Sequence, residues 1–301
     1  MDFRIIRNID QLNKLLTEAG VETRGYPGKP LTDEQKCTRL FHYTKLETFC
    51  KYIWPNKNLR SGEICNLNDL FERYKKVSTE LWSQAALLHA FEVMRNQFRQ
   101  ISFTMDFDSF KEGCMSPLMW AYYADSTNGV CIEFDPNKIH FDSDDICKPI
   151  NYVDGPSREI NIPKDVKSLN DLKSFIHNNV DLIFFTKSSD WEKENEFKIL
   201  TKNEFTYFDV EAITCVYVAS YDSETCLTVE KLVSDQVPVK YFHLDKNSLP
   251  QVSDTKICRE QMIKAKENPQ NFLSRIQQKA EETYIRFKDN PDADLTINVC
   301  D

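Results

Sequence analysis

The chain has 301 residues, enough for one large domain or two small ones. Hydrophobic residues make up 41% of it and charged residues 28%, and 7 glycines with 12 prolines are too few for a collagen or a disordered protein. The net charge of −9 disfavours a protein that binds nucleic acid with its whole surface and leaves a local basic groove open.

No stretch approaches the roughly 18 consecutive apolar residues of a membrane span. Residues 1–7 lack the apolar block of a signal peptide, so we expect a cytoplasmic protein without membrane contact. The 10 cysteines include no pair separated by only two or three residues. This spacing favours buried or free thiols over a zinc site or a redox pair.

The first half of the chain follows an N-terminal extension that we assign to residues 1–38, with a short helix at 10–19. The expected order is a strand at 39–43, a helix at 46–53 ended by Pro55, a strand at 58–61, a helix at 79–99, a strand at 101–104, a helix at 117–124 and a strand at 129–134.

The second half is expected to contain a helix at 169–185, strands at 196–201, 206–210 and 213–219, a helix at 225–235, a strand at 238–242 and one or two helices within 257–287. Strands and helices do not alternate in a strict βαβ rhythm. We therefore predict an α+β fold: one domain at 39–250 with mixed, mostly antiparallel sheets and peripheral helices, followed by a helical extension at 251–301.

Common motifs for phosphate binding, zinc proteolysis and serine hydrolysis are absent, so candidate chemistry rests on groups of residues. On the first strand, His42 and Thr44 share one face and Tyr43 points to the other. A histidine beside a hydroxyl can bond a ribose or a diphosphate, and a buried histidine with a backbone partner is the alternative.

Two further groups precede the middle of the chain. Asn68 or Asp69 can cap a helix, with Glu72 as the capping-box partner, and a functional role for these side chains is the alternative. Ser102 and Thr104 place two hydroxyls on one face of a strand, which is also the pattern of an ordinary exposed face.

The last two groups are aromatic and acidic. Trp120, Tyr122 and Tyr123 can pack in a core or form the floor of a pocket for a flat ring. Glu194 and Glu196 share a face if they enter a strand, where two close carboxylates repel and favour a cation or a proton; a solvated acidic turn is the alternative.

In this order and spacing the groups resemble a bacterial family known as domain of unknown function 2971, over roughly residues 39–245. The matching segments are residues 42–44, 68–72, 102–104, 119–124 with 129–135, and the late run from Lys187 through Trp191 to Lys198. Leu70 stands where the family has proline, and Lys198 stands where it has arginine. The lysine keeps the positive charge but cannot form the two parallel hydrogen bonds of a guanidinium group.

That family is similar to abortive-infection proteins of phage defence, which implies a conditional toxin with an antitoxin or trigger as partner. A looser likeness, to ADP-ribosyltransferases, implies a split pair of small antiparallel sheets around a cleft that binds NAD. It also implies a role for Glu194 or Glu196 in stabilising the ribosyl cation, for His42 in binding ribose, and for Trp120, Tyr122 or Tyr123 in stacking on nicotinamide.

On this hypothesis Arg60 or Lys187 neutralises phosphate, no metal is required, and the acceptor of the ADP-ribose is left open between protein, nucleic acid, small molecule and water. Two alternatives remain. A nuclease-type toxin predicts that Asp69, Glu72, Glu194 and Glu196 hold a divalent cation beside a basic surface. A non-catalytic sensor or adaptor predicts that the polar groups do not converge.

Overall fold

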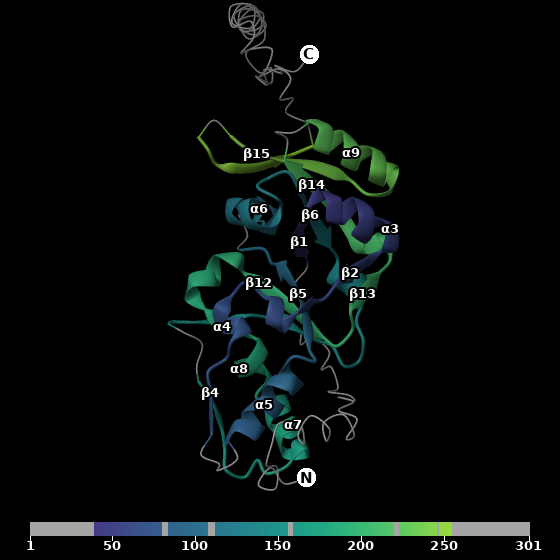
Figure 1. Cartoon of the computed structure of the whole chain (residues 1–301). Helices are drawn as coiled ribbons and strands as arrows, with labels where there is room; N and C mark the ends of the chain where they lie inside the picture. Colours follow the sequence, from purple (N-terminus) through teal and green to yellow (C-terminus); the bar gives the residue numbers. More distant parts are fainter. Residues whose placement is uncertain are drawn as a thin grey trace, which may run out of the picture.

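The computed structural model describes residues 39–79, 84–107, 112–155, 159–219, 223–245 and 247–254. The short helix expected at 10–19 and the helices expected within 257–287 lie outside these residues. In the described part the fold is α+β with mostly antiparallel strands, as predicted (Figure 1). No helix there is long and apolar enough to cross a membrane.

Most strands join one nine-stranded sheet. Its order is β16 (Pro250–Ser253), β15 (Val239–Leu244), β14 (Ile213–Ala219), β6 (Val130–Phe134), β1 (Leu40–Thr44), β5 (Arg99–Thr104), β12 (Glu196–Thr201) and β8 (Ile146–Pro149), and β3 (Gly62–Glu63) pairs with β5. Strand β16 crosses the domain boundary that we predicted at residue 250. The pair β14–β15 is parallel, with a helix between the two strands.

The sheet is almost divided between β1 and β5. Strand β1 makes five residue pairs with β6, and β5 makes six with β12, but a single pair, Phe41 with Thr104, joins β1 to β5. Most of the facing edges of β1 and β5 therefore carry no strand partner. The resemblance implies a split pair of small sheets, whereas β1 and β5 remain joined by this pair in one nine-stranded sheet.

Three small sheets and several helices complete the described fold. The small sheets are β10 (Ile160–Ile162) with β4 (Val77–Thr79), β11 (Thr186–Ser188) with β9 (Asn151–Val153), and β2 (Asn58–Arg60) with β13 (Phe205–Phe208) and β7 (Ile139–His140). The α-helices are α2 (Leu46–Thr48), α3 (Trp54–Asn56), α4 (Leu70–Arg73), α5 (Gln84–Arg95), α6 (Pro117–Tyr123), α7 (Leu169–Asn178), α8 (Val180–Phe184) and α9 (Ser223–Val233).

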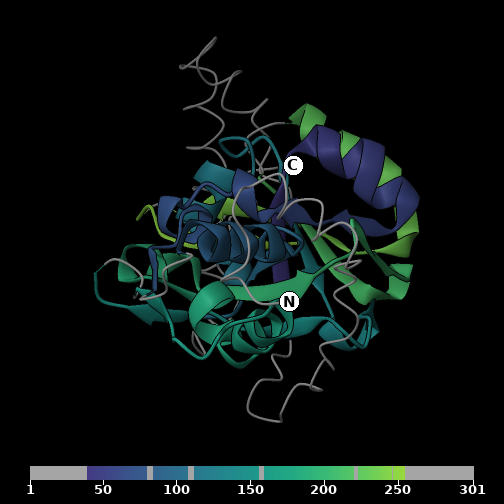
Figure 2. The same cartoon turned by 60° about the horizontal axis from the view of Figure 1, so that its bottom comes forward.

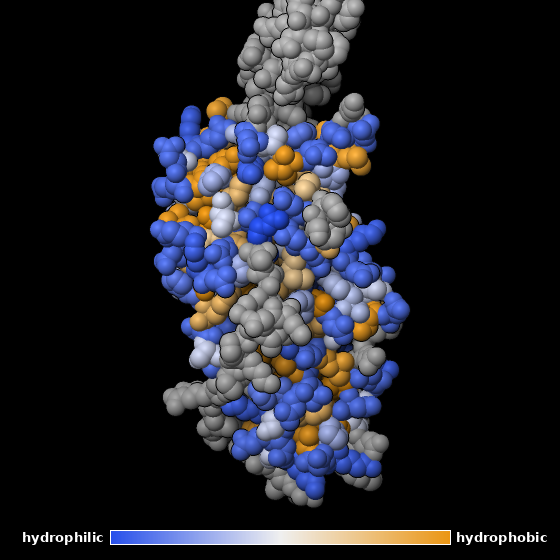
Figure 3. Space-filling view, turned by 180° about the vertical axis from the view of Figure 1, so that it is seen from behind, coloured by the Kyte–Doolittle hydropathy of each residue, from blue (hydrophilic) through white to orange (hydrophobic). Residues whose placement is uncertain are grey.

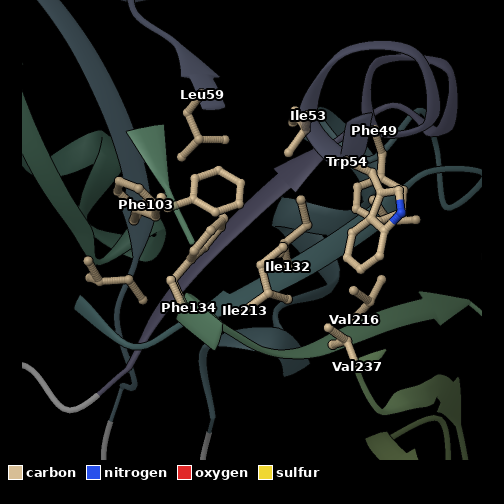
Figure 4. Close-up of a cluster of buried hydrophobic side chains, with 14 of the residues drawn as sticks. Phe49, Ile53, Trp54, Leu59, Phe103, Ile132, Phe134, Ile213, Val216 and Val237 are labelled. Carbon is tan, nitrogen blue, oxygen red and sulfur yellow. The ribbon is translucent and has the colours of Figure 1, made fainter. Parts of the chain in front are cut away.

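One hydrophobic core spans both halves of the sheet, because it includes side chains of β1, β5, β6, β12 and β14. Phe49, Trp54 and Val229 pack with β6 and β14 on one face of the sheet, where Figure 2 shows the helical segment around α3 beside α9 and Figure 4 shows the buried side chains. Helices α5, α7 and α8 form a second core beside β12, at the lower end of Figure 1. Hydrophilic side chains cover much of the face in Figure 3, with scattered hydrophobic groups between them.

Several predicted boundaries were wrong for local reasons. Pro55 does not end the first helix: the helical run continues from α2 through a π-helical turn (Phe49–Ile53) into α3, and it ends at the left-handed Lys57 (φ 50°). The helix expected at 79–99 is shorter, because Thr79 belongs to β4 and Arg99 begins β5. The helix expected at 169–185 breaks at Asn179 into α7 and α8.

Candidate functional site

A cavity of about 360 Å³ lies where β1 and β5 separate. Its polar lining comes from six segments: β1, β2, β5, the loop before α4 with α4 itself, the end of α6, and the run from β11 to β12. The predicted residues that line it are His42, Tyr43, Arg60, Asn68, Glu72, Ser102, Tyr123, Lys187, Glu194 and Glu196. The division of the sheet thus brings together residues up to 154 positions apart in the sequence.

Three glutamates and two lysines, Glu72, Lys187, Glu194, Glu196 and Lys198, form a buried network that we call the cavity cluster. Lys187 Nζ lies 2.7 Å from Glu194 Oε2, 3.1 Å from Glu196 Oε2 and 3.6 Å from Glu72 Oε2. Lys198 Nζ pairs with Glu72 and donates to the Phe184 carbonyl oxygen at 3.0 Å. With all five ionised, the cluster carries one more carboxylate than ammonium group.

Neutral donors hold the two late glutamates in place. The Tyr123 hydroxyl donates to Glu194 Oε1 at 2.6 Å, and Asn68 Nδ2 donates to the Tyr123 hydroxyl at 2.7 Å. The Ser102 hydroxyl donates to Glu196 Oε1 at 2.6 Å. Each carboxylate therefore has one hydroxyl partner and the ammonium group of Lys187, and Glu196 Oε1 also lies 3.9 Å from Lys198 Nζ.

The local backbone explains why both glutamates reach Lys187. Glu194 ends the 3₁₀ helix η7 (Ser189–Glu194), and β12 begins at Glu196, as the strand expected at 196–201 does, so the two glutamates do not share a strand face. Between them Asn195 takes a left-handed conformation (φ 44°), and its side chain donates to the Asp106 carbonyl oxygen at 2.8 Å. Asparagine tolerates this conformation better than most residues.

The carboxyl groups respond differently to burial. Burial raises the pKa of Glu194 above its usual value, against the opposing effect of Lys187. Burial also acts to raise the pKa of Glu72, but Lys198 and Lys187 lower it overall. For Lys187, burial acts to lower the pKa, and the surrounding Glu196, Glu72 and Glu194 raise it well above its usual range. Lys187 is therefore charged at neutral pH.

His42 reaches across the gap between the strands. Its Nδ1 lies 3.1 Å from the Ser102 carbonyl oxygen, which can only accept, so Nδ1 carries the proton. Burial lowers the pKa of the ring, and the neutral form leaves Nε2 as an acceptor. His42 is thus suited to bind a hydroxyl group, and it keeps the backbone partner that the alternative interpretation expected.

Some predicted ligand-binding side chains lie elsewhere. Trp120 is fully buried, stacks on Phe242 at 4.9 Å and donates to the Cys114 carbonyl oxygen, so its proposed stacking on nicotinamide was wrong. Tyr122 is 70% exposed and does not line the cavity. One turn of α6 carries all three aromatic candidates, and only Tyr123 lines the cavity.

Two residues of the first strand also differ from expectation. Tyr43 is buried and its hydroxyl donates to the Gly113 carbonyl oxygen at 2.6 Å, so it is not available to a ligand. Thr44 is buried and lies outside the lining of the cavity.

Within the segment at residues 68–72, Asp69 and Glu72 have different roles. Asp69 caps α4 by accepting from the Phe71 N–H at 2.8 Å and does not line the cavity. Glu72 does not complete a capping box, because its carboxylate turns inward to Lys198 and Lys187. Sequence reasoning missed Gln100 of β5, which lines the cavity two residues before Ser102, whereas Thr104, two residues after Ser102, was already grouped with it on one strand face; the alternation of the strand was the available signal for Gln100.

One family model matches the chain over residues 119–199 and is described as a protein of unknown function (DUF2971). The matched stretch contains Tyr123, Lys187, Glu194 and Glu196, whereas His42, Asn68 and Ser102 precede it. It supports the resemblance to that family over this part of the chain. No curated protein and no solved structure matches the chain significantly.

Proposed function

We propose that the protein cleaves the bond between nicotinamide and ribose in NAD, and passes the ADP-ribose unit to water or to another acceptor, as a toxin of bacterial phage defence. The observation that carries this proposal is the convergence of His42, Ser102, Tyr123, Glu194 and Glu196 on one cavity at the division of the sheet. The defence role rests on the sequence resemblance alone.

The charge of the cavity cluster suits this chemistry. As the bond breaks, its electron pair leaves with nicotinamide, and positive charge develops on the ribose. Glu196, held by Ser102 and Lys187, is placed to stabilise that charge, and the excess carboxylate of the cluster attracts the cationic nicotinamide ring of NAD. Glu194, whose pKa is raised, would take the proton of the attacking acceptor.

The two alternatives fit the geometry less well. A metal-dependent nuclease requires carboxylates free to surround a cation, but the ammonium group of Lys187 already lies between Glu72, Glu194 and Glu196. Within the described residues, no group of three or more His, Cys, Asp and Glu side chains is arranged to hold a metal ion. A non-catalytic adaptor predicts polar groups that do not converge, whereas the polar groups named above line one cavity.

Release of nicotinamide from NAD, followed by chromatography with and without cell lysate, tests the proposal. We expect Glu196→Gln to lower the rate at least about 100-fold and Ser102→Ala about 10-fold, because the first removes the stabilising charge and the second a hydrogen bond that orients it. Glu211→Gln, a change of an exposed glutamate outside the cavity, is the matched control. Circular dichroism of each variant controls for folding.

No nicotinamide release under either condition, together with no NAD binding in calorimetry, would reject the proposal. Equal rates for folded Glu196→Gln and the wild type would reject the assigned role of Glu196.

A further inference from the structure

The two basic side chains that line the cavity differ in what surrounds them. Lys187 is 3% exposed and has three carboxylates within 3.6 Å. These carboxylates already neutralise its ammonium group, so it does not attract an anionic ligand. The Arg60 side chain is 71% exposed and pairs with Glu204 at 3.2 Å, which is itself 49% exposed. Exposed ion pairs of this kind are weak, so an anionic ligand can replace Glu204 at Arg60.

The fold places Arg60 beside the open edge of β5. Arg60 ends β2, and two residues later Gly62 pairs with Gln100 of β5. Toward Thr104, residues 101–103 have no strand partner on this edge in the described chain. Arg60 therefore lies at the end of this unpaired edge opposite the Phe41–Thr104 pair, and it lines the cavity.

Gln100 adds neutral donors at the same place. It lies on the same face of β5 as Ser102, two residues away, which is about 7 Å along a strand. Its buried side chain lines the cavity, as Arg60 does. A phosphate group held here would lie about one sugar unit from the Ser102–Glu196 hydrogen bond.

We propose that Arg60 and Gln100 bind the diphosphate group of a nucleotide substrate, and that this diphosphate displaces Glu204 from Arg60. The guanidinium group matches phosphate with two parallel hydrogen bonds, and Gln100 supplies an uncharged N–H donor. The identity of the substrate as NAD rests on the proposed function, whereas the phosphate site itself can be measured without turnover.

Calorimetry with ADP and with inorganic phosphate tests the site directly. We expect Arg60→Gln to weaken ADP binding at least about 10-fold, and Glu204→Gln to strengthen it about 2-fold because the competing carboxylate is gone. Arg73→Gln, at an arginine outside the cavity, is the control. Equal ADP affinity in Arg60→Gln and the wild type overturns the proposal, and ADP affinity no greater than that of inorganic phosphate overturns the nucleotide assignment.

Kinetics separate this site from the proposed reaction. Arg60→Gln should raise the KM for NAD about 10-fold with kcat nearly unchanged, and should leave the KM for nicotinamide riboside, which has no phosphate, unaltered. A wild type that releases no nicotinamide while Arg60→Gln loses ADP binding would reject the reaction and support the phosphate site. An active Arg60→Gln variant with an unchanged KM for NAD would support the reaction and reject the phosphate site.

Discussion

Two clusters of charged side chains in the described part of the chain differ in their exposure to solvent. In the cavity cluster, Lys187 and its carboxylate partners are each at most 6% exposed. In the second, which we call the Arg39 cluster, Arg39 pairs with Asp106 at 3.0 Å, Glu112 at 3.3 Å and Glu133 at 3.9 Å, and the Arg39 side chain is 31% exposed. Both clusters have more carboxylates than cations.

The difference between them lies in the surroundings. The Arg39 cluster is partly solvated, and its most buried member, Glu133, is satisfied by the hydroxyls of Tyr217 and Thr214. None of its charged groups lines the cavity at the division of the sheet. A surplus of negative charge therefore marks a candidate site only where a ligand has space beside it.

The largest difference is expected on removing the central cation of each cluster. Lys187→Met leaves three buried carboxylates with one lysine, and should lower the free energy of unfolding by about 3–5 kcal/mol. Arg39→Met should lower it by about 1 kcal/mol, because solvent screens the exposed carboxylates. Urea denaturation at pH 7 measures both, and equal losses would contradict the comparison.

A smaller effect is expected from Lys75, which is buried beside the cavity cluster and donates to the Thr186 carbonyl oxygen at 3.3 Å. Burial lowers the pKa of Lys75 to about 8. Because the native pKa lies below the usual 10.5, the native state binds this proton less tightly than the unfolded state. Stability therefore rises as the pH increases from about 8 to 10.5, and below about pH 8 the contribution of Lys75 is constant.

Lys75→Met should therefore be more stable than the wild type by about 1–3 kcal/mol at pH 7, and this gain should shrink toward pH 10. Urea denaturation at several pH values measures the difference, and a gain that does not depend on pH would show that Lys75 is not the cause.

The smallest effect is expected at Asp69. Its Oδ2 is buried without a hydrogen-bond partner in the structure, and burial raises the pKa of the carboxyl. Because the native pKa of Asp69 is raised, its carboxyl stabilises the fold at low pH, and this stability is lost as the pH rises through the native pKa. We therefore expect Asp69→Asn to change the free energy of unfolding at pH 7 by less than about 0.5 kcal/mol. Asp69→Ala should cost about 1 kcal/mol, and a large loss of nicotinamide release in Asp69→Asn would show that the residue does more than cap α4.

Local pattern alone was enough to predict β1, β6, β12 and β14, because hydrophobic alternation and flanking turn residues repeat within a few positions. It also identified most of the side chains that line the cavity. It could not separate Tyr123 from Trp120 and Tyr122, since all three lie within one turn of α6 and their surroundings come from β15, β1 and η7.

The sequence by itself determined the α+β class, the main strands and the set of polar residues available for chemistry, because these depend on short-range periodicity and residue type. Only the tertiary structure decided that β1 and β5 part after one residue pair, and that Lys198 pairs with Glu72, 126 positions away. Such choices depend on the burial and pairing of charges between distant segments, which no local spacing encodes.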